Sequence, residues 1–171
     1  MHVPIPRLPT GMTRTSNRVL DLWHRMAAKP GGKWLFTRLI CLRAPYFATI
    51  RPTFDTLEPG RASVRMGKRR AVHNHIGTVH AIAMCNMAEL AGGVMTDVTV
   101  PSTHRWIPKG MTVEYLAKAE TDLLATASAG DVPDAPEGQD YPVHVDVTDT
   151  RGTTVFRAVI TMWVTPKRER A

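Results

Sequence analysis

The sequence predicts an α+β domain in which one long helix packs against a curved antiparallel sheet. The nearly uncharged run "VHAIAMCNMAELA", residues 79–91, is apolar on almost all sides, as expected of a helix held among other elements. Segments on both sides of this run alternate apolar and polar residues with a period of two, which is typical of strands with one face in a core. A chain of 171 residues is long enough for one such domain.

Residues 1–45 predict an arm followed by two short helices. The first 15 residues are rich in proline and glycine and predict irregular structure. In "SNRVLDLWHRMAAK" Ser16 or Asn17 can cap a helix, which the Pro-Gly-Gly turn at residues 30–32 ends. "KWLFTRLICLR" predicts a second helix, which ends at the Ala44-Pro45 step.

From Tyr46 onward the pattern predicts strands around the long helix. "ATIRPTFDTL" predicts a strand at a sheet edge, because Pro52 cannot donate to a neighbour. "RASVRMGKR" predicts the next strand, and "MTVEYLAKA" and "DLLATASA" follow the helix. "VHVDVTDTRGTTVFRAVITMWV" predicts a long hairpin that turns at Thr150-Arg151-Gly152. We therefore expect an arm and helical extension over residues 1–45, the main domain over 46–166 and a basic tail over 167–171.

The composition limits the partners of the protein. Its 22 Lys and Arg against 15 Asp and Glu give a formal charge of +7, which favours an anionic partner such as nucleic acid, an acidic membrane face or a phosphate-bearing ligand. The charges are dispersed, so we expect no nucleic-acid binding. Cys41 and Cys85 lie in apolar surroundings without a CxxC spacing, which favours reduced core thiols in a cytoplasmic protein. No apolar run reaches the roughly 18 residues that span a bilayer.

The segment "AVHNHIGTVH", residues 71–80, predicts the chemistry of the site. Gly77 permits a tight turn, and Thr78 can cap the long helix. The amides of the first helical turn, near His80 and Ala81, then point outward unpaired and carry a partial positive charge. Such a helix end can polarise a carbonyl and stabilise an oxyanion in acyl transfer.

Glu89 is the one acid in the apolar run. We expect it to be buried among methionine, alanine and leucine, where a carboxylate costs several kcal/mol unless neighbours compensate. Such a cost suggests a catalytic acid, and the alternative is a structural carboxylate held by a hydroxyl or a backbone amide. Nine residues at about 100° each place Glu89 roughly opposite His80 around the helix axis. The two therefore predict a site shared by two helices across a twofold interface.

These residues resemble the active-site signature of hotdog-fold thioesterases of the phenylacetyl-CoA and 4-hydroxybenzoyl-CoA type. That signature has Asn or Gln, five residues, His-Gly-Gly and an acid nine positions after the histidine. Here Asn74 lies six residues before His80, and Glu89 lies nine after it. "NHIGTVHAIAMCNMAELAGG" is closest to an uncharacterised branch of the superfamily with a helical N-terminal extension ending in a "PY" like Pro45-Tyr46.

The resemblance implies an acyl-CoA thioesterase with a hotdog fold, at least a homodimer, that needs no metal or redox cofactor. Glu89 would be the general base or nucleophile, the Ala81 amide beside His80 the oxyanion hole, and Asn74 the group that orients the thioester or water. Gly77 and Ile82 would border the substrate. The glycine pair of the family is Ala81-Ile82 here, and its Thr or Ser one turn after the acid is Gly93.

Three other functions stay open. The histidines at positions 73, 75 and 80 could bind zinc, although no cysteine or carboxylate lies close in sequence. Hotdog dehydratases also use a histidine and an acid, but the context "IGTVHA" fits them poorly. A hotdog module that binds acyl-CoA as a sensor or partner, without turnover, is the main alternative because Ala81-Ile82 and Gly93 depart from the catalytic signature.

Overall fold

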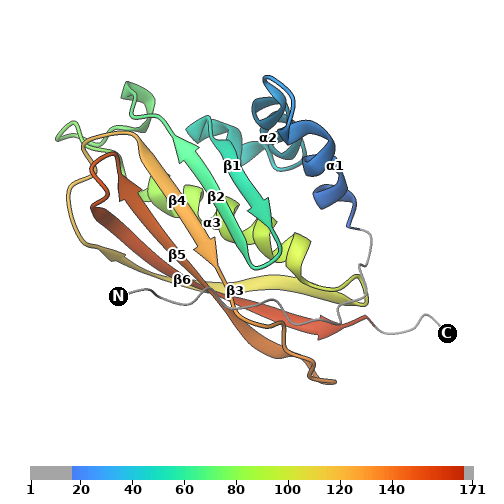
Figure 1. Cartoon of the computed structure of the whole chain (residues 1–171). Helices are drawn as coiled ribbons and strands as arrows, with labels where there is room; N and C mark the ends of the chain where they lie inside the picture. The colour runs from blue at the N-terminus through green and yellow to red at the C-terminus, as the bar shows by residue number, and fades with distance from the viewer. Residues whose placement is uncertain (1–16, 168–171) are drawn as a thin grey trace, which may run out of the picture.

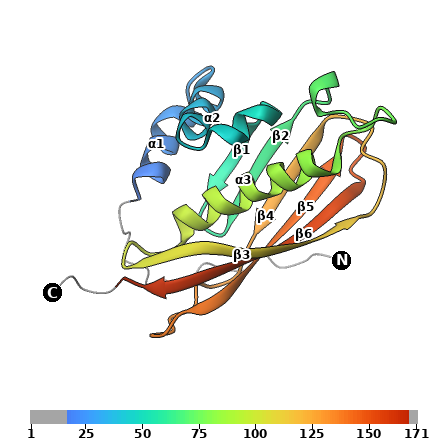
Figure 2. The same cartoon turned by 180° about the vertical axis from the view of Figure 1, so that it is seen from behind.

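The computed structural model describes residues 17–167, which form one antiparallel sheet and a long helix, α3 (Ala81–Thr99), that lies across one face of it (Figure 1). The order of the six strands is β1-β2-β4-β5-β6-β3, so β1 and β3 are the two edges. Figure 2 shows α3 in front of the sheet, as a hotdog arrangement requires. The predicted α+β class is confirmed. The strands are β1 (Thr53–Glu58), β2 (Arg61–Met66), β3 (His104–Tyr115), β4 (Leu123–Ser128), β5 (Gln139–Asp149) and β6 (Thr154–Pro166).

The long helix continues past the end of the apolar run at Ala91 and includes Gly92 and Gly93. It ends at Thr99, where the backbone becomes extended at Val100. Glycine disfavours a helix interior by about 1 kcal/mol relative to alanine. Tertiary contacts oppose that preference here, since Gly92 packs against Ile160 and Val143 of the sheet, and the following Met95 is fully buried.

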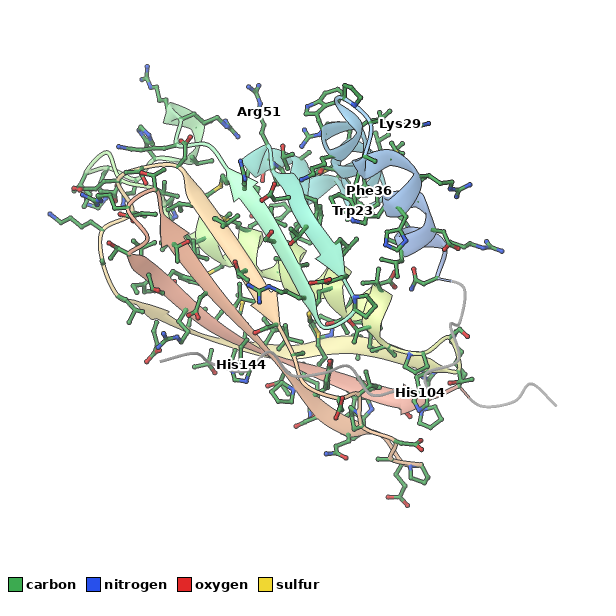
Figure 3. The ribbon with its side chains drawn as sticks, in the orientation of Figure 1. Trp23, Lys29, Phe36, Arg51, His104 and His144 are labelled. Atoms are coloured by element: carbon green, nitrogen blue, oxygen red, sulfur yellow. The ribbon has the colours of Figure 1, made fainter. Side chains whose placement is uncertain are left out.

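The N-terminal extension consists of α1 (Arg18–Ala27), α2 (Gly32–Arg43) and the 3-10 helix η1 (Pro45–Ile50). The predicted cap is confirmed at Asn17, whose side chain accepts from the amides of Val19 and Leu20. Trp23 of α1 and Phe36 of α2 pack edge to face, with ring centroids 5.1 Å apart (Figure 3). Phe54 of β1 completes this aromatic cluster.

A hydrogen bond ties the extension to the edge of the sheet. The Thr37 hydroxyl donates to Lys33 O at 2.7 Å and accepts from the Phe54 amide at 2.9 Å. Thr37 and Phe54 are both fully buried. The extension thus packs along the β1 edge, which limits pairing with another strand there.

The strand expected over residues 48–57 begins only at Thr53. Residues 45–50 form η1 instead, and Arg51 follows in the left-handed region with φ 48°. Proline suits the first helical position, since its ring fixes φ near the helical value and its missing N–H would have no partner there. The alternation of apolar residues across this stretch therefore came from two different elements, and a strand over residues 48–52 was wrong.

The remaining strands agree with the sequence pattern. β2 and β4 lie within their expected segments, 61–69 and 122–129, while β3 starts earlier than expected, at His104, and ends at Tyr115. The β5–β6 hairpin turns at residues 150–152 as expected, and the buried Asp149 accepts there from the amides of Arg151 and Thr153. The arm over residues 1–15 and most of the tail, residues 168–171, lie outside the described residues. Within residues 17–167, no helix is both long and apolar enough to cross a membrane.

Candidate functional site

A cavity of about 380 Å³ lies at the N-terminal end of α3. One wall comes from the loop before the helix and the first helical turns, including Asn74, Ala81 and Met84. The other wall comes from the end of β3 and the chain that follows, including Tyr115 and Lys118. The cavity thus brings two of the predicted site residues, Asn74 and Ala81, together.

One backbone amide of the helix end remains available to a ligand in this cavity. His80, not the expected Thr78, caps α3, and its Nδ1 accepts from the Ile82 amide at 3.1 Å. His80 O accepts from the amides of Ala83 and Met84, at 3.0 and 3.3 Å. Within residues 17–167, the Ala81 amide has no acceptor. It is therefore an unpaired donor at the positive end of the helix dipole, on a residue that lines the cavity.

The Asn74 side chain is used largely to hold its own loop. Its Oδ1 accepts from the amides of Ile76 and Thr78, both at 3.1 Å, and its Nδ2 donates to Thr78 Oγ1 at 2.8 Å. Gly77, with φ 82°, makes the turn between them, a conformation that side-chain-bearing residues rarely adopt. One of the two Nδ2 hydrogens remains for another acceptor. Asn74 is thus a structural residue of the loop as well as a residue of the cavity wall.

Glu89 is exposed, which corrects the expectation that it is buried within the chain. It lies on the side of α3 that faces away from the sheet, together with Ile82, which is 54% exposed. Gly93 follows one turn after Glu89. A Cβ added at Gly93 would lie 3.7 Å from the Trp106 side chain of β3. The apolar run in the sequence predicted that most of the helix is buried, but it did not indicate which side of the helix is exposed. We refer to this side, from Ile82 to Gly93, as the open side of α3.

Tyr115 is a site residue that the sequence reading missed. It is 53% exposed, lines the cavity, and its hydroxyl lies 3.7 Å from the Cys85 thiol on the open side of α3. The contact with Cys85, aided by desolvation, raises the pKa of the Tyr115 hydroxyl above its ordinary value. The hydroxyl therefore stays protonated near neutrality and can donate a hydrogen bond. Cys85 itself is half-buried rather than a core thiol, whereas Cys41 is buried as expected.

A buried polar contact borders the open side of α3 near η1. Asn86 is 6% exposed, and its Nδ2 donates to Thr49 Oγ1 at 3.2 Å. Arg69 donates to Thr49 O at 2.6 Å. Asn86 Oδ1 and Arg69 Nε are buried without a hydrogen-bond partner among the described residues. The sequence did not predict this contact, because a single polar residue in an apolar run is equally expected on the exposed surface of a helix.

The histidines of the segment do not assemble into a metal site. Among residues 17–167, no group of three His, Cys, Asp or Glu side chains could hold a metal ion. His80 caps the helix, His75 is exposed, and His73 is half-buried with an unpartnered Nε2. The residues that line the cavity include Ala81, Tyr115 and Lys118, whose amide, hydroxyl and ammonium groups are donors that suit a carbonyl or an anion.

The fold is similar to that of several solved structures. The genomics target APC5556 shares 47% identity with this chain over 87% of this chain and 98% of its own, with a TM-score of 0.76. A Pseudomonas aeruginosa protein of unknown function and probable thioesterase is 23% identical over 76% and 93%, with a TM-score of 0.67. A Haemophilus influenzae thioesterase is 9% identical over 80% and 94%, with a TM-score of 0.68. At such low identities the last two support the fold alone.

A family model matches residues 32–164, which is most of the chain. The model is described as a domain of unknown function, DUF4442, and it includes α2, the sheet and α3. No curated protein matches the sequence. The expected resemblance to hotdog thioesterases is confirmed at the level of the fold. The chain thus belongs to the DUF4442 family and has the hotdog fold of the thioesterases to which it is similar.

Proposed function

We propose that the protein hydrolyses acyl-CoA thioesters at a composite site that combines the α3 N-terminus of one protomer with Glu89 of another. The observation that carries this proposal is the unpaired Ala81 amide in the cavity at the end of α3. A preorganised amide at a helix N-terminus is suited to the developing oxyanion of acyl transfer. The chain also shares its fold with two proteins that are named as a probable thioesterase and a thioesterase.

In this proposal the thioester carbonyl oxygen accepts a hydrogen bond from the Ala81 amide. Glu89, as general base, removes a proton from a water molecule that attacks the carbonyl carbon. The tetrahedral intermediate then loses the coenzyme A thiolate as the C–S bond breaks, the thiolate takes up the proton from Glu89, and a carboxylic acid remains. A direct attack by Glu89, with hydrolysis of the resulting anhydride, is the nucleophilic variant of the same reaction. Lys118 lines the cavity and offers a cation to an anionic part of the ligand.

The position of Glu89 supports a shared site. Glu89 is not among the residues that line the cavity of its own chain, and it lies on the open side of α3. A twofold arrangement with antiparallel helices would bring each Glu89 to the helix end of the partner. The β3 edge, which pairs only with β6 among the described strands, offers a second surface for such a dimer.

Binding of acyl-CoA without turnover is the second candidate function. It is favoured by Ile82, whose 54% exposed side chain stands beside the helix end in place of a family glycine. It is favoured also by Gly93, which supplies no hydroxyl one turn after Glu89.

Turnover of a panel of acyl-CoA thioesters, followed with a thiol reagent, distinguishes the two functions. We expect release of free thiol by the wild-type protein and a loss of about 10²- to 10⁴-fold in kcat for Glu89→Gln, with unchanged melting temperature. Glu58→Gln changes an exposed acid of β1 and is the matched control. Saturable binding of acyl-CoA by the wild type with no thiol release would favour the binding module and contradict hydrolysis.

Subunit mixing tests the composite site. A variant that lacks Glu89 and one with a disabled Asn74 loop are each expected to be inactive, since each dimer then lacks one element of both sites. After verified subunit exchange, heterodimers should regain one intact site and a measurable part of the activity. If activity does not return, the two elements belong to one chain, or Glu89 is structural.

A further inference from the structure

The outer face of the N-terminal extension exposes large apolar side chains. Five of the eleven large apolar residues that are exposed within residues 17–167 lie in the 13 residues from Trp34 to Tyr46. Two are strongly exposed, Leu42 at 78% and Tyr46 at 67%. We refer to this set as the α2 face: Trp34, Leu35, Leu39, Leu42 and Tyr46.

The α2 face forms because α2 is apolar on two sides and only one side packs within the chain. The inner side is buried through Phe36, Thr37 and Cys41, which face α1 and β1. On the outer side Leu35, Leu39 and Leu42 follow one another at spacings of four and three residues, so they form a single stripe. A contiguous apolar stripe on the surface of a helix normally packs against another apolar surface. The outer stripe therefore fits a partner that is itself apolar.

The α2 face lies in a part of the chain that has no acidic residue. Between Asp21 and Asp55 the sequence has no Asp or Glu and six Lys or Arg. Lys33 pairs with Asp55, and Arg38 donates to a backbone carbonyl. The other four cations are exposed, and Figure 3 shows two of them, Lys29 and Arg51, pointing away from the body of the protein. The four are Arg25, Lys29, Arg43 and Arg51.

We propose that the α2 face docks onto an anionic phospholipid surface, with α2 lying in the plane of the interface. Leucines and the Trp34 and Tyr46 rings suit the boundary between acyl chains and headgroups, and flanking Lys and Arg side chains reach the anionic headgroups. A second copy of the same face fits less well, because symmetric self-contact would bring these cations against one another. Binding to the phosphate backbone of a nucleic acid would leave the leucine stripe without an apolar partner.

Vesicle flotation of the full chain tests the proposal. The vesicles contain phosphatidylcholine alone or phosphatidylcholine mixed with anionic phosphatidylglycerol. We expect binding to the mixed vesicles at least about tenfold tighter than to the neutral ones, weakening as salt rises. The double variant Leu39→Gln/Leu42→Gln should lose about tenfold or more of that affinity, and Arg43→Gln/Arg51→Gln should lose most of the preference for anionic lipid.

Two controls separate docking from general adsorption. Ile107→Gln removes an equally exposed apolar side chain, 61% exposed, from β3, and Arg61→Gln removes an exposed cation from β2. Both should bind vesicles as the wild type does. Brominated lipids should quench the tryptophan fluorescence of the wild type more than that of Trp34→Leu, because Trp34 enters the interface.

Three results would overturn the proposal. The first is no binding of the wild type to anionic vesicles. The second is equal binding by the wild type and Leu39→Gln/Leu42→Gln, which would show adsorption by charge alone. The third combines two observations: the wild type does not bind vesicles, and Leu39→Gln/Leu42→Gln has a lower mass in light scattering than the wild type. That result would assign the α2 face to a contact with a second copy of the chain.

Discussion

The two sides of α3 differ in what their residues contact. On the side toward the sheet, Met87, Leu90 and Met95 are fully buried, and Gly92 lies against β5 and β6. On the open side Ile82 and Glu89 are exposed and Cys85 is half-buried. Substitutions on the sheet side should therefore change stability, whereas substitutions on the open side should change the proposed activity and leave the fold intact.

Asn74 lies at the end of α3, and we expect it to affect both stability and the proposed activity. Asn74→Ala removes three side-chain hydrogen bonds of the loop, so we expect a loss of roughly 2–4 kcal/mol in the free energy of unfolding, measured with urea, together with lower turnover. Asn74→Asp keeps the oxygen acceptor for the two backbone amides and removes the Nδ2 donor. If Asn74 also orients substrate, Asn74→Asp should lose about 10²-fold in kcat/KM while it keeps most of the stability. Wild-type kcat/KM in Asn74→Asp would make the residue purely structural.

The adjacent glycines of α3 test the division within one helical turn. A Cβ at Gly92 would lie 2.9 Å from Ile160 Cδ1 and 3.2 Å from Val143 Cγ1, whereas one at Gly93 would make an ordinary contact of 3.7 Å with Trp106. We expect Gly92→Ala to lower the free energy of unfolding by about 1–3 kcal/mol. Gly93→Ala should raise it by up to about 1 kcal/mol, because alanine favours a helix more than glycine does. Equal effects in urea denaturation would mean that the two sides of the helix are not distinct.

Ile82 tests the open side alone. Its exposed side chain stands beside the Ala81 amide, so Ile82→Ala should widen the approach to the helix end and raise kcat/KM several-fold for bulky acyl groups. Because the side chain is 54% exposed, stability should change by no more than about 0.5 kcal/mol. A large fall in melting temperature would show that Ile82 packs against a partner chain.

Substitution of Asp97 is expected to have the smallest effect on stability, and that effect depends on pH. Burial raises the pKa of the Asp97 carboxyl, and a hydrogen bond from Trp106 and the charge of Arg43 offset this only in part. The folded state thus holds the proton more tightly than the unfolded state, whose pKa is about 3.9. The stability contribution is fully present below that value and is lost as the pH rises through the higher folded pKa.

Asp97→Asn stays neutral, so it should melt above the wild type at pH 7, by no more than about 4 °C, and this gain should vanish below about pH 4. Asp134→Asn, at an exposed position, should leave the melting temperature unchanged at both pH values. A lower melting temperature of Asp97→Asn at pH 7 would mean that the interaction with Arg43 outweighs burial.

Elements whose residues carry a strong local pattern could be predicted from the sequence alone. The period of two located β2, β4 and the β5–β6 hairpin, because alternate side chains of a strand face one core. The apolar run located α3, and Asn17 marked the start of α1 through a cap that acts within three residues. The residues Asn74, His80 and Glu89 resemble the signature of hotdog thioesterases, and this resemblance implied the fold and placed Asn74 and Ala81 at the helix end where the cavity lies.

Several other features are not determined by the local sequence pattern and depend on tertiary contacts. Gly92 continues α3 because the sheet leaves room for no side chain there, and residues 45–50 turn as η1 because Pro45 starts a turn packed against α3. Glu89 is exposed because the sheet covers the opposite side of an evenly apolar helix. The free donor at Ala81 likewise depends on His80, whose imidazole takes the next amide. These outcomes rest on contacts between residues distant in sequence, and periodicity carries no information about such contacts.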